Sequence, residues 1–207
     1  EPPPAVAVLA EKWTDYEVKT KFRILETCAN LHFRSRYIGG NGYSVQIVPG
    51  AKDNVKVFRH GGNKSDPLAT LSPPAPLEEG AWHEIHVAAS ADVFSIRIDG
   101  VEIGTVRDKT HPAGVPGVGA LRDDGTWGRA EFDDFRVTRG DAVLFEEDFN
   151  KPALNNFQDL LFVGGAFSQP RDGVLSVRAT RSLIEDKRGL EAPLFRKTFS
   201  VTRPVRR

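Results

Sequence analysis

Short runs in which apolar and polar residues alternate recur throughout the chain, and they restrict its fold more than any other feature of the sequence. In the run from Tyr43 to Ile47 and in the run from Phe94 to Ile98, every second residue is apolar and the residues between are polar. A repeat of two is the period of a β-strand, because successive side chains of a strand point to opposite sides. None of these runs sustains a helical repeat. The pattern therefore predicts an all-β protein.

Turn residues separate these runs and indicate how the strands connect. The 207 residues include 19 glycines and 14 prolines, which fall between the alternating runs. An Asp99-Gly100 pair joins residues 93–98 to 101–106, and such a pair favours a two-residue hairpin turn with positive φ at both positions. Further strands are predicted at 30–36, 54–60, 117–122, 130–138, 143–148 and 174–178. About ten such strands predict two antiparallel sheets packed face to face, in a jelly-roll β-sandwich.

The charge and the cysteine content exclude several classes of function. Lys and Arg together number 28, as do Asp and Glu, so the formal net charge is zero. A neutral chain has no overall field to hold a polyanion, and we predict no nucleic-acid partner. No apolar run approaches the roughly 20 residues of a membrane-spanning helix, so no membrane partner is expected. The single cysteine, Cys28, excludes an intrachain disulfide and is predicted to be a small buried hydrophobe.

Composition changes along the chain and indicates four segments. Three consecutive prolines mark residues 1–11 as an extended lead-in, and the main sandwich is predicted over 12–139. Residues 140–192 are predicted to form a connector with short strands, and 193–207 the truncated start of a second β-domain. The chain contains no methionine and its last predicted strand stops at the chain end. We therefore expect it to be a piece of a longer protein, with any signal peptide outside it.

Three acidic residues on one predicted strand raise the question of glycoside hydrolysis. Glu131, Asp133 and Asp134 approach the Glu-x-Asp-x-x-Glu pattern of laminarinase-type sandwich glycosidases, but Arg136 stands where the second glutamate belongs. Retaining hydrolysis needs two carboxyl groups roughly 5 Å apart, so we predict no catalytic residue on this strand. Asp133 and Asp134 are instead predicted to cap strand ends or to bind a structural Ca²⁺ ion, which prefers oxygen ligands.

The histidines do not form a recognisable metal or catalytic motif. His83 and His86 are three residues apart, which on a strand places them on opposite faces, His83 with Ile85 and His86 with Glu84. A structural role is therefore predicted for both. No serine or cysteine occupies a nucleophile motif such as Gly-x-Ser-x-Gly. The sequence thus predicts no catalytic residue.

Polar and aromatic residues in the predicted loops point to sugar binding. Planar side chains stack on the C–H faces of sugars, and Asn, Asp and Arg bind vicinal hydroxyls through paired hydrogen bonds. The alternative is that the aromatic residues belong to the core and that the charged ones are solvated loop residues. The candidate ligand-binding residues are Arg34, Asn41, Tyr43, His60, Asn63, Asp123 and Trp127.

Four motifs follow one another between Trp13 and Val137. They are Phe33-Arg34-Ser35, Asn41-Gly42-Tyr43-Ser44-Val45-Gln46-Ile47, Gly80-Ala81-Trp82-His83-Glu84-Ile85 and Ile96-Arg97-Ile98-Asp99-Gly100. Their order resembles the concanavalin-A-like, laminin-G-like sandwich of many bacterial carbohydrate-active proteins. The resemblance implies the fold more than the function, because this sandwich occurs in lectins, hydrolases and inert spacers alike.

Two segments of the second half narrow the resemblance. They are Val143-Leu144-Phe145-Glu146-Glu147-Asp148-Phe149-Asn150 and Pro193-Leu194-Phe195-Arg196-Lys197-Thr198-Phe199. With the sandwich they resemble the non-catalytic N-terminal region of bacterial α-L-rhamnosidases of glycoside hydrolase family 78, where the sandwich is similar to the rhamnose-binding module of carbohydrate-binding module family 67. This resemblance implies a plant or algal glycan ending in L-rhamnose as ligand. It also implies a downstream catalytic domain in the same protein and a secreted or periplasmic location.

In those modules an Asp-Asn pair before the tyrosine-containing strand contacts both rhamnose and a calcium ion. The resemblance places Asn41 at the second position of the pair, whereas Gly40 occupies the first. We expect Asn41, Arg34 and Tyr43 to form the core of the sugar contact. One carboxylate fewer weakens a calcium site unless an acid from another loop replaces it. The candidates for that replacement are Asp53, Asp66, Asp123 and Asp124.

Two other functions compete with this expectation. The Phe33-Arg34 strand followed by Gly42-Tyr43-Ser44-Val45-Gln46-Ile47 also resembles the bacterial 3-keto-disaccharide hydrolase-like domain, which would make the chain an enzyme that acts on keto-sugars. The glycine at position 40 favours instead a structural spacer that binds nothing. Our prediction is the non-catalytic, carbohydrate-binding part of a multidomain α-L-rhamnosidase, with these two functions as alternatives.

Overall fold

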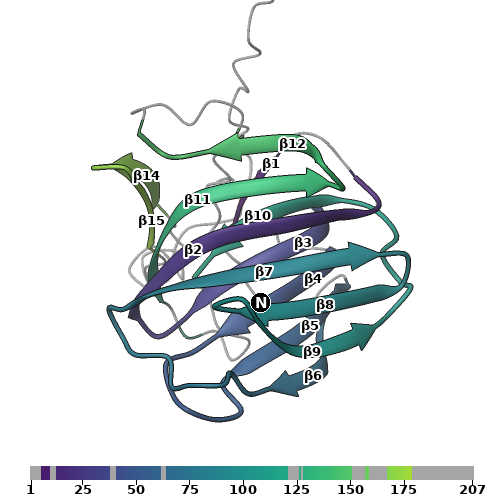
Figure 1. Ribbon diagram of the computed structural model, residues 1–207, viewed down its shortest axis with the longest axis horizontal. Helices are drawn as coiled ribbons and strands as arrows, with labels where there is room; N and C mark the ends of the chain where they lie inside the picture. The colour runs from purple at the N-terminus through teal and green to yellow at the C-terminus, as the bar shows by residue number, and fades with distance from the viewer. Residues whose placement is uncertain are drawn as a thin grey trace, which may run out of the picture.

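The computed structural model describes residues 6–9, 13–37, 41–61, 64–120, 126, 128–150, 157–158 and 167–178. In these residues every regular element is a β-strand, and the strands form two antiparallel sheets that pack face to face, with the eight-stranded sheet in front in Figure 1. This architecture confirms the predicted all-β jelly-roll sandwich. None of the described residues forms a helix that is long and apolar enough to cross a membrane.

One sheet has seven strands in the order β13-β1-β10-β3-β4-β5-β6. Its strands are β1 (Val6–Leu9), β3 (Ala29–Tyr37), β4 (Asn41–Ile47), β5 (Val55–Gly61), β6 (Lys64–Leu71), β10 (Val115–Gly119) and β13 (Phe157–Gln158). The strands β3, β4 and β5 follow one another in sequence and lie side by side in this sheet. Their ends and their outer face provide most of the polar groups of the candidate site described below.

The other sheet has eight strands, seven of them in the order β14-β15-β11-β2-β7-β8-β9. The eighth strand, β12, pairs with the second half of β11, whose first half pairs with β15. The strands are β2 (Tyr16–Glu26), β7 (Trp82–Ser90), β8 (Val93–Ile98), β9 (Val101–Arg107), β11 (Arg129–Arg139), β12 (Ala142–Glu147), β14 (Phe167–Arg171) and β15 (Val174–Arg178).

The predicted hairpin is confirmed. β8 and β9 pair across Asp99 and Gly100, whose φ angles are 49° and 79°. Both values are positive, as the two-residue turn of a twisted hairpin requires. The predicted strands at 30–36, 54–60, 130–138, 143–148 and 174–178 also coincide with observed strands to within a few residues.

The core lies between the sheets and follows the predicted alternation. In β2, every second residue from Tyr16 to Ile24 is buried, and the residues between them face outward. Cys28 is also buried, which confirms its prediction as a small core residue. The core side chains with no more than 1% exposure include Val18, Phe22, Leu31, Phe33, Tyr43, Val45, Ile85, Phe94, Ile96 and Phe132.

Two features of the fold were not predicted. β6 contains Pro67 and mostly exposed residues, so it lacks the alternation of a half-buried strand, and it lies at the edge of its sheet, where proline is tolerated. The strands β1 and β12–β15 come from the predicted lead-in and connector, yet they pair with strands of the sandwich. The sheets therefore extend past residue 139. Residues 193–207 lie outside the described part of the chain.

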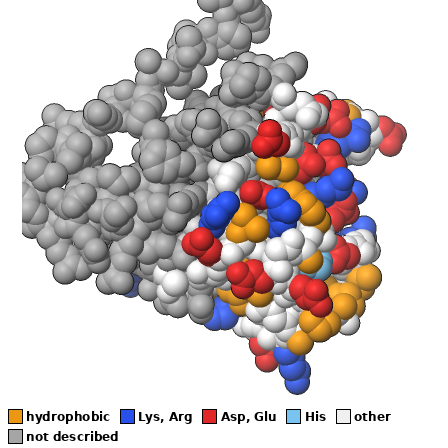
Figure 2. All heavy atoms as spheres, turned by 90° about the vertical axis from the view of Figure 1, so that its left-hand side faces the viewer, with side chains coloured by type: hydrophobic (Ala, Val, Ile, Leu, Met, Phe, Trp, Pro, Cys, Tyr) orange, Lys and Arg blue, Asp and Glu red, His pale blue; other side chains and the backbone are white. Residues whose placement is uncertain are grey.

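The outer face of the eight-stranded sheet carries polar contacts between strands. Lys19 forms an ion pair with Glu84 at 2.7 Å, and Nε2 of His86 lies 2.9 Å from Oε2 of Glu17. His83, by contrast, packs toward the core ring of Phe22, with ring centroids 5.8 Å apart, so the predicted opposite orientation of the two histidines is confirmed. On the described part of the surface in Figure 2, acidic and basic side chains lie interspersed. Neither sign forms a continuous patch there that would suit a polyanion.

Candidate functional site

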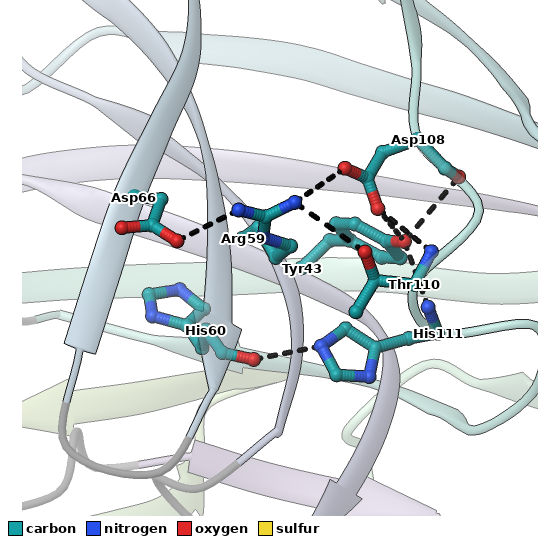
Figure 3. A network of polar contacts seen from close by, with 7 residues as sticks. All are labelled: Tyr43, Arg59, His60, Asp66, Asp108, Thr110 and His111. Carbon is teal, nitrogen blue, oxygen red and sulfur yellow. Dashed lines mark hydrogen bonds and ion pairs between the residues drawn. The ribbon is translucent and has the colours of Figure 1, made fainter.

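Polar side chains converge at the end of the sandwich where β4 begins and β5 ends. The antiparallel register places Asn41 opposite Gly61 and Tyr43 opposite Arg59. The segment after β9 reaches the same end and adds three more residues. We call the group drawn around Arg59 in Figure 3 the rim cluster; its members are Tyr43, Arg59, Asp66, Asp108, Thr110 and His111.

Tyr43 connects the core to the rim cluster. Its ring is fully buried and stacks on Phe33, with centroids 5.2 Å apart. Its hydroxyl donates a hydrogen bond to Oδ1 of Asp108 at 2.7 Å and accepts one from the backbone N–H of His111 at 2.9 Å. Burial raises the pKa of Tyr43 to about 12, so the hydroxyl keeps its proton near pH 7. Tyr43 is therefore a fixed donor and not a base.

Arg59 holds two carboxylates at the rim. Its guanidinium donates to Oδ2 of Asp108 at 2.9 Å and to Oδ2 of Asp66 at 2.8 Å. Burial on its own would raise the pKa of Asp108, but hydrogen bonds from Thr110 and Tyr43 and the charge of Arg59 outweigh it and lower the pKa to about 2. Each of these carboxyl groups thus already has a cationic partner.

His60 lies next to Arg59 but points to the opposite side, as alternation along β5 requires. On the outer face of the sheet its Nε2 atom lies 2.7 Å from Oγ of Ser44, and its Nδ1 atom lies 2.9 Å from Oγ of Ser65. Its carbonyl accepts a hydrogen bond from Nε2 of His111 at 2.8 Å (Figure 3). Burial, with a smaller effect of His111, lowers the pKa of His60 to about 4. Its imidazole is therefore neutral near pH 7.

Three of the seven predicted ligand-binding residues meet at this end of the sandwich. Asn41 and Tyr43 begin β4, and His60 lies on β5 opposite Gly42. Tyr43 is a core aromatic residue, as the alternative interpretation proposed, but its hydroxyl still reaches the rim cluster. The other predicted residues are Arg34, described below, and Asn63, Asp123 and Trp127, which lie outside the described residues.

Arg34 is buried, with 1% exposure, and its guanidinium connects separate parts of the backbone. It donates from Nε to the carbonyl of Thr14 at 2.9 Å, from Nη1 to the carbonyl of Ala91, and from Nη2 to Oδ1 of Asp15 at 3.2 Å. Its Cζ atom also lies 5.2 Å from the ring centroid of Phe94. These contacts give Arg34 a structural function between the two sheets.

The acidic residues of β11 lie on the other sheet. Glu131 accepts hydrogen bonds from Arg23, and Asp134 forms an ion pair with Lys21 at 2.6 Å. Asp133 and Asp134 lie where the pairing of β11 with β2 shifts register, and Asp134 has a φ of 49°. In the described part of the chain, no group of three or more His, Cys, Asp or Glu side chains could hold a metal ion. Calcium at this pair therefore stays a prediction.

The rim cluster contains residues that the sequence analysis missed. Arg59 follows Val55 and Val57 at the same spacing of two, so it lies on the face of β5 that points to the core. A charged residue at that position indicates that the core ends there. The Asp108-x-Thr110 spacing is typical of a turn in which the carboxylate accepts the N–H two residues later, and that bond is 2.8 Å long. Neither signal identifies which strands meet, and for that the register was needed.

The rim can bind a polar ligand more readily than it can hydrolyse a glycosidic bond. Both of its carboxyl groups are paired with the same guanidinium, that of Arg59, which does not provide the separate acid and nucleophile that retaining hydrolysis needs. The half-buried His60 and His111 and the exposed Ser65 and Asp66 instead present planar rings and hydrogen-bonding groups. Such a combination suits an uncharged polyol.

The comparisons with known proteins agree with this fold. Residues 2–138 match the family model described as 3-keto-alpha-glucoside-1,2-lyase-like domain. No curated protein matches the chain. Among solved structures, the carbohydrate-binding module CBM66 from Bacillus subtilis is 19% identical with a TM-score of 0.57, and the match covers 67% of this chain and 84% of that chain. A tetrameric galectin from the ball sponge Cinachyrella sp. is 14% identical with a TM-score of 0.48, covering 63% and 96%.

Proposed function

The chain belongs to the 3-keto-alpha-glucoside-1,2-lyase-like domain family, and we propose that it binds a glycoside at the end of the sandwich formed by β4, β5 and residues 108–111. The family match is the observation that carries this proposal. The matched residues include all the strands that build the rim cluster, and the family is named for a glucoside. The rim supplies hydrogen-bonding groups of the kind that recognise sugar hydroxyls. For one small uncharged sugar we expect micromolar to millimolar affinity.

The nature of the sugar is a finer proposal. The resemblance of the Asn41-Gly42-Tyr43 segment to a rhamnose-binding module supports a terminal L-rhamnose, and with it a parent α-L-rhamnosidase that is secreted or periplasmic. The family name supports a glucoside oxidised at C3 instead. Both sugars are neutral and of similar size, so the same rim could accept either. Direct competition between them distinguishes the two.

A second candidate function is the elimination that the family name describes. In a 3-keto glucoside the carbonyl acidifies the proton at C2. A base removes that proton, a C1–C2 double bond forms, and the C1–O bond breaks as the aglycone leaves and takes up a proton. This reaction needs a base and not the paired carboxylates of hydrolysis. His60 is the candidate base, because its imidazole is neutral near pH 7, although its lowered pKa of about 4 makes it a weaker base than an ordinary histidine.

Isothermal titration of the chain with three sugars tests the binding proposal. The panel is methyl α-D-glucopyranoside, its 3-keto derivative and L-rhamnose. We expect saturable binding of at least one of them, about tenfold weaker in His60→Ala, because loss of the imidazole removes a planar surface of the site and releases the Ser44 and Ser65 hydroxyls that it holds in place, at a cost on the order of 1–2 kcal/mol. His86→Ala is the matched control, since His86 is also half-buried beside one hydrogen-bonding partner but lies on the other sheet.

The outcomes separate the candidates. Binding that is equally strong in His60→Ala and in the wild type would place the sugar elsewhere and contradict the proposed site. No binding of any of the three sugars would favour the spacer. Release of methanol together with the unsaturated 3-keto sugar that carries the C1–C2 double bond, measured in the same samples, would establish the elimination, since hydrolysis would give methanol and the saturated 3-keto sugar. Loss of the unsaturated product in His60→Ala would assign the base.

A further inference from the structure

His32 on β3 is a buried polar side chain, and its Nε2 atom has no hydrogen-bonding partner among the described residues. Its exposure is 3%. A buried polar atom without a partner reduces stability, so such atoms are rare in folded proteins and need an explanation. A bound ligand that supplies the missing partner is one such explanation.

The surroundings of His32 connect it to the candidate site. The register of β3 and β4 places His32 directly opposite Ser44, on the outer face of the sheet. Ser44 is in turn the hydrogen-bonding partner of His60, at 2.7 Å, and the ring centroids of the two histidines lie 6.1 Å apart. Ser65 holds the other nitrogen of His60 at 2.9 Å. His60 and Ser44 are therefore fixed by each other and by Ser65, while Nε2 of His32, beside them, is buried and has no partner among the described residues.

The charge of this group indicates what it can bind. Burial, with a smaller effect of His60, lowers the pKa of His32 to about 3, so both imidazoles are neutral near pH 7. A neutral imidazole offers one N–H donor and one acceptor nitrogen. A sugar hydroxyl, which both donates and accepts, matches either nitrogen, whereas a carboxylate finds no positive charge on these rings.

We propose that a hydroxyl group of an uncharged glycoside completes the hydrogen bonding of Nε2 of His32, which makes His32 a specificity-determining residue on the outer face of β3. The inference rests on the proposed function, because it adds one contact to the same ligand. It extends the site from the rim cluster onto the sheet face, through Ser44 and His60.

Three variants and two ligands test this inference. His32→Phe replaces the imidazole with a somewhat larger ring that has no nitrogens, His32→Gln keeps a polar amide near the position of Nε2, and His86→Phe is the control on the other sheet. Each is titrated with methyl 3-keto-α-D-glucopyranoside, and its melting temperature is measured without sugar. We expect affinity about tenfold lower in His32→Phe, within about threefold of wild type in His32→Gln, and unchanged in His86→Phe.

The melting temperature distinguishes a binding role from a structural one. His32→Phe removes a buried polar atom that lacks a partner, so we expect its melting temperature to equal or exceed that of the wild type. A marked fall, with unchanged affinity, would overturn the inference. The wild type should also bind the 3-keto glycoside at least about tenfold more tightly than methyl α-D-glucuronoside, and equal affinities would overturn the preference for an uncharged ligand.

Two further outcomes keep this inference separate from the proposed function. Sugar binding by the wild type with equal affinity in His32→Phe would overturn the inference alone. No sugar binding by the wild type would overturn the proposed function and the inference with it. If His32→Phe does not fold, the ¹⁵N chemical shift of Nε2 in the wild type gives the answer: we expect it to change on addition of the glycoside, and a constant shift at saturation would contradict the contact.

Discussion

Removal of the Tyr43 hydroxyl measures how strongly the rim cluster stabilises the fold. Tyr43→Phe retains the ring that packs against Phe33 but loses the hydrogen bond to Asp108 and the acceptor for the N–H of His111. A hydrogen bond to a charged group contributes about 1.5–3 kcal/mol, so we expect the free energy of unfolding to fall by about 2–3 kcal/mol at pH 7. For a chain of this length, the melting temperature should fall by roughly 5–10 °C.

The loss should depend on pH in one direction. Asp108 has a folded pKa of about 2, below its ordinary value of 3.8. A carboxylate whose pKa is lowered by folding adds stability above its unfolded pKa, and that stability is lost as the pH falls through the folded value. Because Tyr43 contributes to the lowering, the deficit of Tyr43→Phe should be full above pH 5 and should shrink as the pH falls from about 4 toward 2.

Urea denaturation at pH 7 and pH 3, followed by tryptophan fluorescence, provides the assay. Tyr16→Phe is the matched control: the hydroxyl of Tyr16 is also buried, but it accepts a hydrogen bond from the neutral backbone N–H of Arg34, at 2.7 Å. Its deficit should be the same at both pH values. If Tyr43→Phe lowers the free energy of unfolding by less than about 0.5 kcal/mol, or by the same amount at both pH values as the control does, the rim cluster does not stabilise the fold in the way described.

Three further predictions concern the scaffold. In Gly114→Ala the new Cβ would lie 2.6 Å from the backbone nitrogen of Ser35, so we expect the free energy of unfolding to fall by more than about 3 kcal/mol. Gly61→Ala is the control, because a Cβ at Gly61 meets open space, and its loss should be about 1 kcal/mol or less in the same chemical denaturation experiment. Arg34→Met should cost about 2–4 kcal/mol in the same assay, because three hydrogen bonds from a buried guanidinium are lost, and a cost below about 1 kcal/mol would contradict its structural role. If Asp133 and Asp134 bind calcium, CaCl₂ should raise the melting temperature in a way that EDTA reverses, and no rise would exclude the site.

The sandwich could be predicted from the sequence because its signals are local. Alternation in β2, β4 and β8 identifies the buried face of each strand without any knowledge of its neighbours, and Asp99-Gly100 specifies its own turn. β6 escaped prediction because an edge strand does not need to alternate and tolerates Pro67. Local patterns thus suffice where a strand alternates or follows a specified turn, as β9 does at the edge of its sheet, and they fail for an edge strand such as β6 that has neither signal.

The candidate site could be predicted only in part because it depends on pairing. Asn41 and Tyr43 were found from their motif, but the partner of Tyr43 is Asp108, 65 residues away, and that of Asp108 is Arg59, 49 residues away. Only the register and the position of the loop after β9 bring them together. Arg34 was placed among the ligand contacts because the sequence does not reveal that its φ of 48° interrupts the alternation of β3.

The sequence supported two functions because the same motifs resemble two families. The motifs from Phe33 to Ile47 resemble both a rhamnose-binding module and a 3-keto-disaccharide hydrolase-like domain. Both have the same fold, and a fold does not specify a ligand. The family match supports the second resemblance and leaves the rhamnosidase context as a proposal.

The most direct test of the central claim is an NMR titration of the ¹⁵N-labelled chain with methyl 3-keto-α-D-glucopyranoside. If the sugar binds at the rim cluster and on the adjoining sheet face, the amide signals that shift should belong to residues 41–44, 58–61, 65–66 and 108–111. The signals of Lys19, Glu84 and His86, on the outer face of the other sheet, should stay in place. Shifts confined to that other face, or no shifts at millimolar sugar, would contradict the account.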